Sequence, residues 1–397
     1  MIRRLLRATL WLLLLGTMSM AGLLLALWLR HNQDVVLPAP GGPFAVGRVG
    51  YDWVDQARPE TLRPEINAQR ELMVWVWYPA APPPGVAPAP YLPGNWAAAI
   101  AQDGGAGAFL AQNLGHVHAR AVADAPLAST SNTFPVLLLE PGYGHIATDY
   151  SVLAEDLASH GYVVVGVTPT YSASVVVFPD GRVARRTPEG SIPEDSPDAA
   201  RPVLDRLVAV WAADDQFALD QMTHLNAADP AGRFTGRLDM ANVGALGHSL
   251  GGAAAAQFCH VDQRCKAGVD LDGTLYSDVV RAGLSQPFMF IWSEPDDPTD
   301  AEWQHSTRDA NAVFATLPHG YQVTVHGARH FNFADMAVLY APAFHMLGAL
   351  GPIDGQRGLA ITTTYVRAFF DSSLKQQTPA LLANSASDPP DVQIERR

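Results

Sequence analysis

The chain has 397 residues, of which 48% are hydrophobic and 16% are charged, enough apolar material for one large core. Its 26 basic and 39 acidic residues give a net charge of −13. An acidic chain without basic runs repels nucleic-acid phosphates, so we expect no nucleic-acid partner.

The N-terminus departs from a soluble pattern. Residues 8–29 carry no charge, and as a helix they would extend about 33 Å, which is enough to span a bilayer. The preceding Arg3, Arg4 and Arg7 favour a cytoplasmic N-terminus, which places the remaining chain on the periplasmic or extracellular side. The alternative is a signal peptide cleaved after Ala21 and a secreted domain, but "GLLLALWL" would then remain at the new terminus. We therefore favour an uncleaved anchor over residues 1–30.

The next segments are less regular. Residues 31–69 are expected to form a linker and an entry segment. Residues 70–79 (RELMVWVWYP) are rich in β-branched and aromatic side chains and predict a strand. Residues 91–134 are rich in Ala and Gly, with Trp96 and Phe109 among them, and we expect them to cover a site and line its pocket.

Strong signals begin at residue 134. Predicted strands cover residues 134–140, 162–171, 241–246, 266–273, 287–294 and 321–330, and predicted helices cover residues 149–160, 203–226 and 253–258. Apolar strands that alternate with helices predict a mainly parallel sheet covered on both faces. Residues 70–375 would form this α/β domain, and residues 376–397 a disordered tail.

The stretch Gly247-His248-Ser249-Leu250-Gly251 fits the G-x-S-x-G pattern between a strand and a helix. In this context the pattern is a nucleophile elbow, a strained turn that exposes a serine hydroxyl beside a helix N-terminus. The sequence therefore predicts an α/β-hydrolase fold with Ser249 as the nucleophile. We expect the adjacent His248 to point away from the reaction and to pack in the turn.

A serine nucleophile needs a histidine base and a carboxylate, and this fold supplies them in the order Ser, acid, His. His330 follows the last predicted strand and is the expected base. Two strand ends offer an acid: Asp270 and Asp272 at one, and Glu294, Asp296 and Asp297 at the next. Local pattern does not decide between them.

An oxyanion formed in the reaction needs backbone N–H donors. The residue after the nucleophile, Leu250, is one expected donor. The loop Pro141-Gly142-Tyr143-Gly144 should supply the other, and Tyr143 is the better candidate because Pro141 has no N–H.

Over residues 70–370 the chain resembles the plasma-type platelet-activating factor acetylhydrolases, which are group VII phospholipases A2. The resemblance rests on the ordered blocks "WYP", "PGYG", "DLASHGYVVVGV", "GHSLGGA", "LDG", "QPFMFIWSE", "HFNFAD" and "HMLGALGPID". It implies Ser249 as nucleophile, His330 as base and Asp272 as acid, with Asp296 and Asp297 kept as alternative acids. It implies oxyanion donors at Tyr143 and Leu250, although the family usually has His where this chain has Pro141.

The resemblance also implies calcium-independent hydrolysis of short or oxidised sn-2 acyl chains. We therefore expect a membrane-anchored serine esterase without a metal or organic cofactor, acting on short-chain acyl esters and truncated phospholipids. A cutinase-like polyester hydrolase or a general esterase is the alternative, and a non-catalytic membrane-tethered binding protein is a remote one.

Cys259 and Cys265 are the only cysteines. They flank a short turn between the elbow helix and the next predicted strand. Because an exported domain lies in an oxidising compartment, we expect them to form a disulfide.

Overall fold

The computed structural model describes residues 2–104, 113–130, 133–193, 197–378, 380–383 and 389–397. The strands of its main sheet are β2 (Ala45–Pro59), β3 (Gln69–Ala80), β5 (Val122–Ala123), β6 (Phe134–Glu140), β7 (Val163–Thr168), β10 (Leu238–His248), β11 (Cys265–Leu271), β12 (Phe288–Ser293), β13 (Gly320–Val325) and β14 (Val392–Arg396). Within the described residues they form a 10-stranded sheet in the order β14-β13-β12-β11-β10-β6-β7-β3-β2-β5. The central strands from β13 to β7 are parallel, and β14, β3 and β2 each pair antiparallel with a neighbour.

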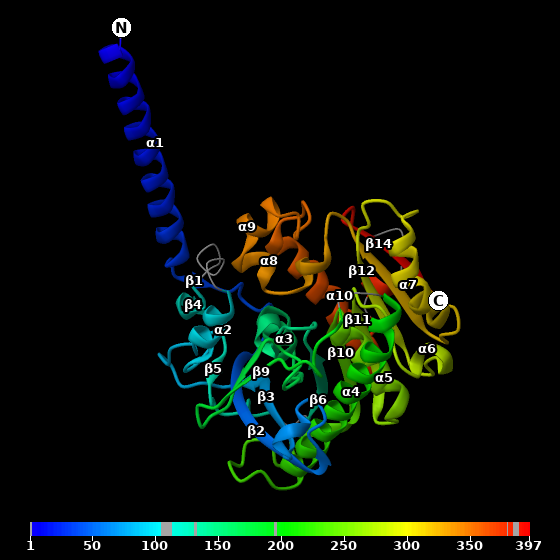
Figure 1. Ribbon diagram of the computed structural model, residues 1–397. Coiled ribbons are helices and arrows are strands. Elements are labelled where there is room, and N and C mark those ends of the chain that lie inside the picture. Colours follow the sequence, from blue (N-terminus) through cyan, green and yellow to red (C-terminus); the bar gives the residue numbers. More distant parts are fainter. Residues whose placement is uncertain (1, 105–112, 131–132, 194–196, 379, 384–388) are drawn as a thin grey trace.

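Helices cover both faces of this sheet, as the alternating pattern predicts (Figure 1). On one face α5 packs against β10 and β11 and against α4; on the other, α10 packs against α3. The helices after the N-terminal one are α2 (Trp96–Gly104), α3 (Ser151–Ser159), α4 (Pro197–Ala228), α5 (Leu250–Val261), α6 (Val279–Ala282), α7 (Ala301–Phe314), α8 (Met336–Leu339), α9 (Ala341–Met346), α10 (Gly355–Lys375) and α11 (Ala380–Ala383).

Short elements complete the chain. They are the strands β1 (Val35–Val36), β4 (Val117–His118), β8 (Val175–Val177) and β9 (Val183–Arg185) and the 3₁₀ turns η1 (Pro64–Ile66), η3 (Leu114–His116), η4 (Ala147–Tyr150) and η5 (His330–Phe333). Two of the 3₁₀ turns, η4 and η5, lie in loops that follow sheet strands, and the site is built in this region.

The central strands read as continuous apolar runs because both of their faces are covered. Every residue of β6, β7 and β12 is buried. Removing so many branched side chains from water is the main favourable term that fixes these strands in the sheet.

Buried charged groups link this core to α4. The Arg70 guanidinium at the start of β3 pairs with Asp214 of α4 at 2.6 Å and with Glu60 at 2.9 Å. The next residue, Asp215, and Glu140 at the end of β6 are also completely buried. Burial raises the pKa of both carboxyls well above the ordinary range, and the nearby Asp214 carboxylate raises both further.

Three expectations about segments need correction. The expected entry segment 31–69 contains β2, which pairs with β3 along its length. The expected disordered tail contains β14, which adds an antiparallel edge strand to β13. The final predicted strand also ends early, at Val325, so that His330 begins the turn η5.

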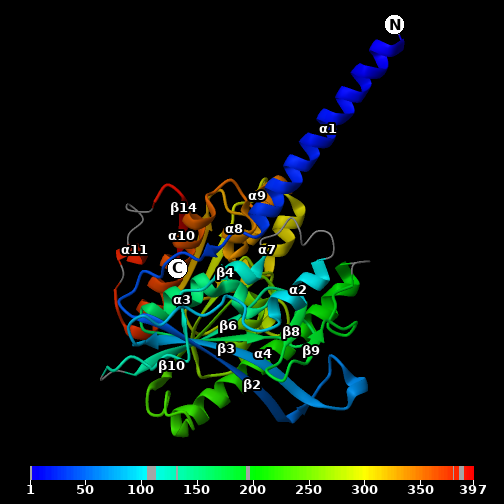
Figure 2. The same cartoon turned by 90° about the vertical axis from the view of Figure 1, so that its left-hand side faces the viewer.

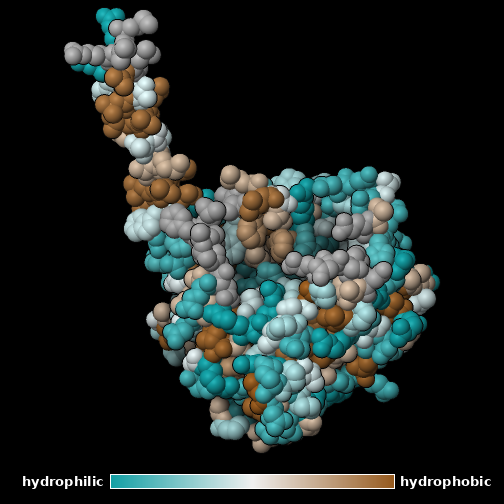
Figure 3. Space-filling model, in the orientation of Figure 1, coloured by the Kyte–Doolittle hydropathy of each residue, from teal (hydrophilic) through white to brown (hydrophobic). Residues whose placement is uncertain are grey.

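The N-terminal helix α1 (Ile2–His31) projects away from the domain, as both views show (Figure 1 and Figure 2). Within Thr9–His31 an 18-residue stretch has a mean hydropathy of 2.1, and none of it is buried. Figure 3 shows the helix as a largely hydrophobic rod that stands clear of a mixed surface. The helix is long and apolar enough to cross a membrane, a property that a signal sequence shares.

Candidate active site

The predicted nucleophile lies in a sharp turn between β10 and α5. Ser249 has a φ of 56° and a ψ of −124°, a conformation that non-glycine residues rarely adopt. Its N–H donates to the Leu271 carbonyl at 2.8 Å, which ties the turn to the neighbouring strand. A Cβ at Gly247 would overlap the backbone of Gly251, so only glycine allows β10 and α5 to approach this closely. These are the features expected of a nucleophile elbow.

The structure brings His330 and Asp272 together. The His330 Nδ1 atom lies 2.8 Å from Asp272 Oδ2. The other carboxylate oxygen, Oδ1, accepts a hydrogen bond from the Ser293 N–H at 2.8 Å. Asp272 follows β11 directly, at a φ of 58°, and its own N–H donates to the Ile291 carbonyl. The carboxylate is thus fixed by two neighbouring strands and aimed at the histidine.

The alternative acids lie in other contacts. Both oxygens of Asp296 accept hydrogen bonds from Arg329 at 2.8 Å, and the Asp296 side chain is exposed. Asp297 accepts hydrogen bonds from the N–H and the hydroxyl of Thr299. Neither carboxylate is bonded to His330.

The two predicted oxyanion donors flank the serine. Leu250 is the first residue of α5, and Tyr143 lies in the loop after β6. Among the described residues, the N–H groups of Tyr143 and Leu250 donate to no protein acceptor. The neighbouring Gly142 N–H is occupied, because it donates to the Tyr150 hydroxyl at 2.9 Å. This leaves the loop with the donor pattern that an oxyanion requires.

Ser249, His330, Asp272, Tyr143 and Leu250 all line one cavity of about 620 Å³. Its walls are aromatic to an unusual degree, with the side chains Tyr143, Tyr276, Trp292, Trp303 and Phe331. The turn after β11, the end of β12 and helix α7 contribute most of the wall opposite the serine.

The expectation that residues 91–134 line this pocket is wrong for the described residues. Among the described residues of this segment, β5 pairs with β2 at the edge of the sheet, whereas Ser249 lies at the end of the central strand β10. Trp96 instead lines a separate cavity of about 460 Å³ together with Arg48 and Trp75. Phe109 lies outside the described residues.

The loop after His330 is held by two polar side chains to which sequence reasoning gave no role. The Asn332 Oδ1 atom accepts hydrogen bonds from the N–H groups of Arg329 and Gly351, each at 2.8 Å. The Asp335 carboxylate accepts bonds from the N–H groups of Ser151 and Val152, at the first turn of α3. The block "HFNFAD" marked these positions, but only the fold shows that Asp335 caps a helix far away in sequence.

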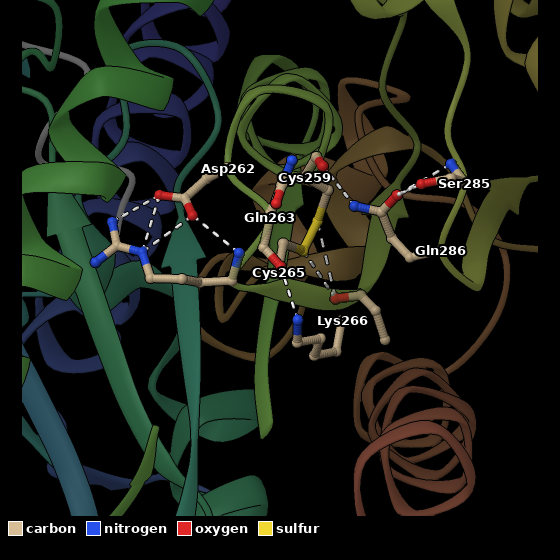
Figure 4. The surroundings of a disulfide bond; sticks show 9 residues. Cys259, Asp262, Gln263, Cys265, Lys266, Ser285 and Gln286 are labelled. Atoms are coloured by element: carbon tan, nitrogen blue, oxygen red, sulfur yellow. Dashed lines mark hydrogen bonds and ion pairs between the residues drawn. A yellow bond between two sulfur atoms is a disulfide. The ribbon is translucent and has the colours of Figure 1, made fainter. Parts of the chain in front are cut away.

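Cys259 and Cys265 form a disulfide between the end of α5 and the start of β11, with their Cα atoms 4.9 Å apart (Figure 4). The Gln286 side chain donates to the Cys259 carbonyl, so the loop before β12 is fastened to the same point. The bridge closes the return from the elbow helix to the strand that carries Asp272.

The fold and the site together define an ester hydrolase of the α/β-hydrolase class. A ferulic acid esterase from Streptomyces cinnamoneus has a similar structure: the TM-score is 0.76 and the identity is 28%, and the match covers 91% of this chain and 99% of that one. The more particular relationship comes from sequence. Residues 30–191 and 218–388 match the model of the platelet-activating factor acetylhydrolase, isoform II, family, and the chain belongs to this family.

Two relatives illustrate the range of the family. A probable 1-alkyl-2-acetylglycerophosphocholine esterase from Arthroderma benhamiae is 26% identical, in a match that covers 91% of this chain and 94% of the relative. A platelet-activating factor acetylhydrolase from Cavia porcellus is 25% identical over 68% of this chain and 65% of its own length. The chain is therefore a carboxylic ester hydrolase.

Proposed function

We propose that Ser249, His330 and Asp272 form the catalytic triad of this esterase and that the reaction passes through an acyl-enzyme. The observation that carries this proposal is that the elbow serine and the Asp272-bonded histidine open on the same cavity. Because Nδ1 of His330 is bonded to Asp272, its Nε2 atom is the one left to accept the serine proton.

In the first half of the reaction, Ser249 Oγ attacks the ester carbonyl while His330 takes the hydroxyl proton. The N–H groups of Tyr143 and Leu250 stabilise the oxyanion, and His330 returns the proton to the departing alcohol. In the second half, His330 takes a proton from water, the resulting hydroxide attacks the acyl-enzyme, and Ser249 is released with its proton restored. No metal ion is needed in any of these steps.

We propose short acyl esters as substrates, including phospholipids whose sn-2 chain is truncated. The family membership supports the phospholipid class. The size of the cavity, about 620 Å³ and lined by Trp292, Trp303 and Tyr276, favours short acyl chains over long ones.

A second candidate is an ester with an aromatic acyl group. The aromatic wall of the cavity favours it, because flat rings stack on Trp and Tyr side chains. The similar structure of an enzyme named for ferulic acid points in the same direction.

We propose that α1 remains attached and anchors the domain to a membrane, with the domain on the non-cytoplasmic side; secretion after cleavage is the alternative. The unburied apolar span Thr9–His31 supports anchoring. A disulfide is expected of a protein in an oxidising compartment, which agrees with both locations.

A hydrolysis panel tests the enzymatic proposal. We expect p-nitrophenyl acetate and butyrate to be cleaved faster than the palmitate ester, and sn-2 acetyl phosphatidylcholine faster than a long-chain one. Ser249→Ala should reduce the hydrolysis rate to background. The control variant Ser285→Ala, which changes an exposed serine, should retain the wild-type rate. EDTA should leave the rate unchanged.

The outcomes separate the parts of the proposal. Activity that survives in Ser249→Ala, or that is lost in EDTA, contradicts the mechanism. A preference for long chains contradicts the substrate proposal alone, and methyl ferulate cleaved faster than p-nitrophenyl acetate supports the aromatic candidate.

A further inference from the structure

A buried chain of hydrogen bonds runs beneath the active site. The Gly142 N–H, in the loop that carries Tyr143, donates to the Tyr150 hydroxyl at 2.9 Å. That hydroxyl lies 2.7 Å from Nδ1 of His248. The Nε2 atom of His248 lies 2.9 Å from the carbonyl oxygen of His330. The chain thus joins the oxyanion loop, the elbow and the loop of the base.

The direction of each bond follows from the chemistry of its ends. A carbonyl only accepts, so the His248 Nε2 atom carries the proton and Nδ1 accepts from the Tyr150 hydroxyl. That hydroxyl has a lone pair for the Gly142 N–H. Burial, followed by the nearby His330 and His145, lowers the pKa of His248 well below its usual range, so the ring stays neutral with this one tautomer. Burial likewise raises the pKa of Tyr150, which keeps its proton.

We propose that Tyr150 and His248 are positioning residues for the esterase reaction, through a one-directional hydrogen-bond chain that couples the oxyanion loop to the loop of the catalytic histidine. This inference rests on the proposed function, since it assigns these residues to the same reaction. His248 is among the residues that line the cavity, but neither side chain is assigned as the nucleophile or the base. They act through the Gly142 peptide and the His330 backbone.

The chain sets the geometry on both sides of the serine. The Gly142 N–H is held by Tyr150, and the next N–H along this loop, that of Tyr143, has no protein acceptor among the described residues, while Tyr143 itself lines the cavity. At the other end, the bond to the His330 carbonyl fixes the backbone from which the imidazole extends. Both His248 and Tyr150 are buried, so water does not replace a lost bond.

Phe substitutions test this chain. Tyr150→Phe keeps the ring and removes the link, and His248→Phe removes both bonds of the imidazole. We expect kcat on p-nitrophenyl butyrate to fall about 10- to 100-fold in each, less than the 10²–10³ of a deleted oxyanion donor, because the donor is displaced and not removed. KM should change by less than about 3-fold, since the cavity wall stays in place. Each kcat is normalised to active sites titrated with a fluorophosphonate.

Two further variants make the test specific. The double variant Tyr150→Phe/His248→Phe should be no slower than the slower single variant, because both substitutions interrupt one chain. His248→Gln keeps an N–H donor for the His330 carbonyl and should recover part of the kcat lost in His248→Phe.

The matched control is Tyr78→Phe. Tyr78 is equally buried, and its hydroxyl donates to the Ala125 carbonyl at 2.8 Å, on the opposite side of the sheet's centre from β11. It should lose stability like Tyr150→Phe but keep the wild-type kcat.

The inference is overturned if Tyr150→Phe retains wild-type kcat per titrated site. It is also overturned if the fold-loss of kcat in the double variant equals the product of the fold-losses in the two single variants. A wild-type protein without esterase activity would instead refute the proposed function.

Discussion

At the scale of single residues, the position of each carboxylate relative to His330 decides which one can serve as the acid of the triad. Asp272 leaves β11 in a left-handed conformation that turns its side chain toward His330, with 6% of the side chain exposed. Asp296 lies one strand further along the sheet, on the surface, and neutralises Arg329. An exposed pair of this kind contributes little energy, whereas a carboxylate that fixes a catalytic histidine affects every turnover.

We therefore predict that Asp272→Asn lowers kcat by about 10⁴-fold, because an amide no longer holds His330 in the required tautomer. Asp296→Asn is the matched control and should stay within about 3-fold of the wild type. Steady-state kinetics on p-nitrophenyl acetate measure both. A severe loss in Asp296→Asn beside a mild one in Asp272→Asn would reverse the assignment.

The sequence pattern located the ends of the strands but not where the loops that follow them place their side chains. It placed Ser249 and His330 because a motif and a chain order define them. It left the acid open between two strand ends, since the turn at Asp272 depends on a positive φ that no alternation of residues indicates. The block "HFNFAD" marked the positions of Asn332 and Asp335 but not their partners, and Tyr150 had no local signal, because the roles of all three depend on contacts between distant segments.

At the scale of secondary-structure elements, β6 and α4 meet through the carboxyls of Glu140 and Asp215. Their folded pKa values are raised, so the native state binds more protons than the unfolded chain once the pH exceeds the unfolded value of about 4.3 for Glu. Their contribution to stability is complete below that pH and is lost as the pH rises toward the folded pKa.

We predict that Glu140→Gln flattens this dependence. The wild type should lose up to about 1.4 kcal/mol of unfolding free energy per pH unit for each such proton above pH 5, and the variant should lose less. Urea unfolding at pH 5, 7 and 9 measures the slopes, with the exposed Glu395→Gln as control. An identical slope in wild type and Glu140→Gln would show that Glu140 is ionised in the native state.

Burial separates the strands that the sequence predicts from those that it does not. The central strands β6, β7 and β12 were predictable because they are long apolar runs in which every residue is buried. The strands β2 and β14 were missed because β2 mixes buried, partly buried and exposed residues without a regular alternation, β14 has only five residues, and both carry charged side chains. Edge strands take much of their order from the neighbour they pair with, and a single segment does not display that neighbour.

At the scale of the whole molecule, we expect the stability of the domain to depend little on helix α1. None of the span Thr9–His31 is buried, so the domain gains no packing from it. The largest error at this scale was the pocket wall: no described residue of segment 91–134 is among those that line the cavity at Ser249, and Val122–Ala123 of this segment pair with β2 instead.

We predict that deleting residues 1–30 releases the domain from the membrane fraction and leaves kcat on p-nitrophenyl acetate within about 2-fold. The full chain should resist alkaline carbonate extraction, as an inserted helix does, and mass spectrometry should find its N-terminus before residue 8. If the full-length gene is expressed and its product is found in the medium with Gly22 as its first residue, secretion after cleavage is established instead.

The connection between α1 and the domain is short and is held by contacts with the domain. The carbonyl of His31, the last residue of the helix, accepts a hydrogen bond from the Asn113 N–H at 2.9 Å, and Leu37 is already completely buried. If α1 is retained as the proposed membrane anchor, this short connection limits how far the domain can turn away from the bilayer. The enzyme would then diffuse in two dimensions, so its encounters with a lipid ester would depend on the number of esters per unit area of its own leaflet and not on their concentration in the surrounding volume.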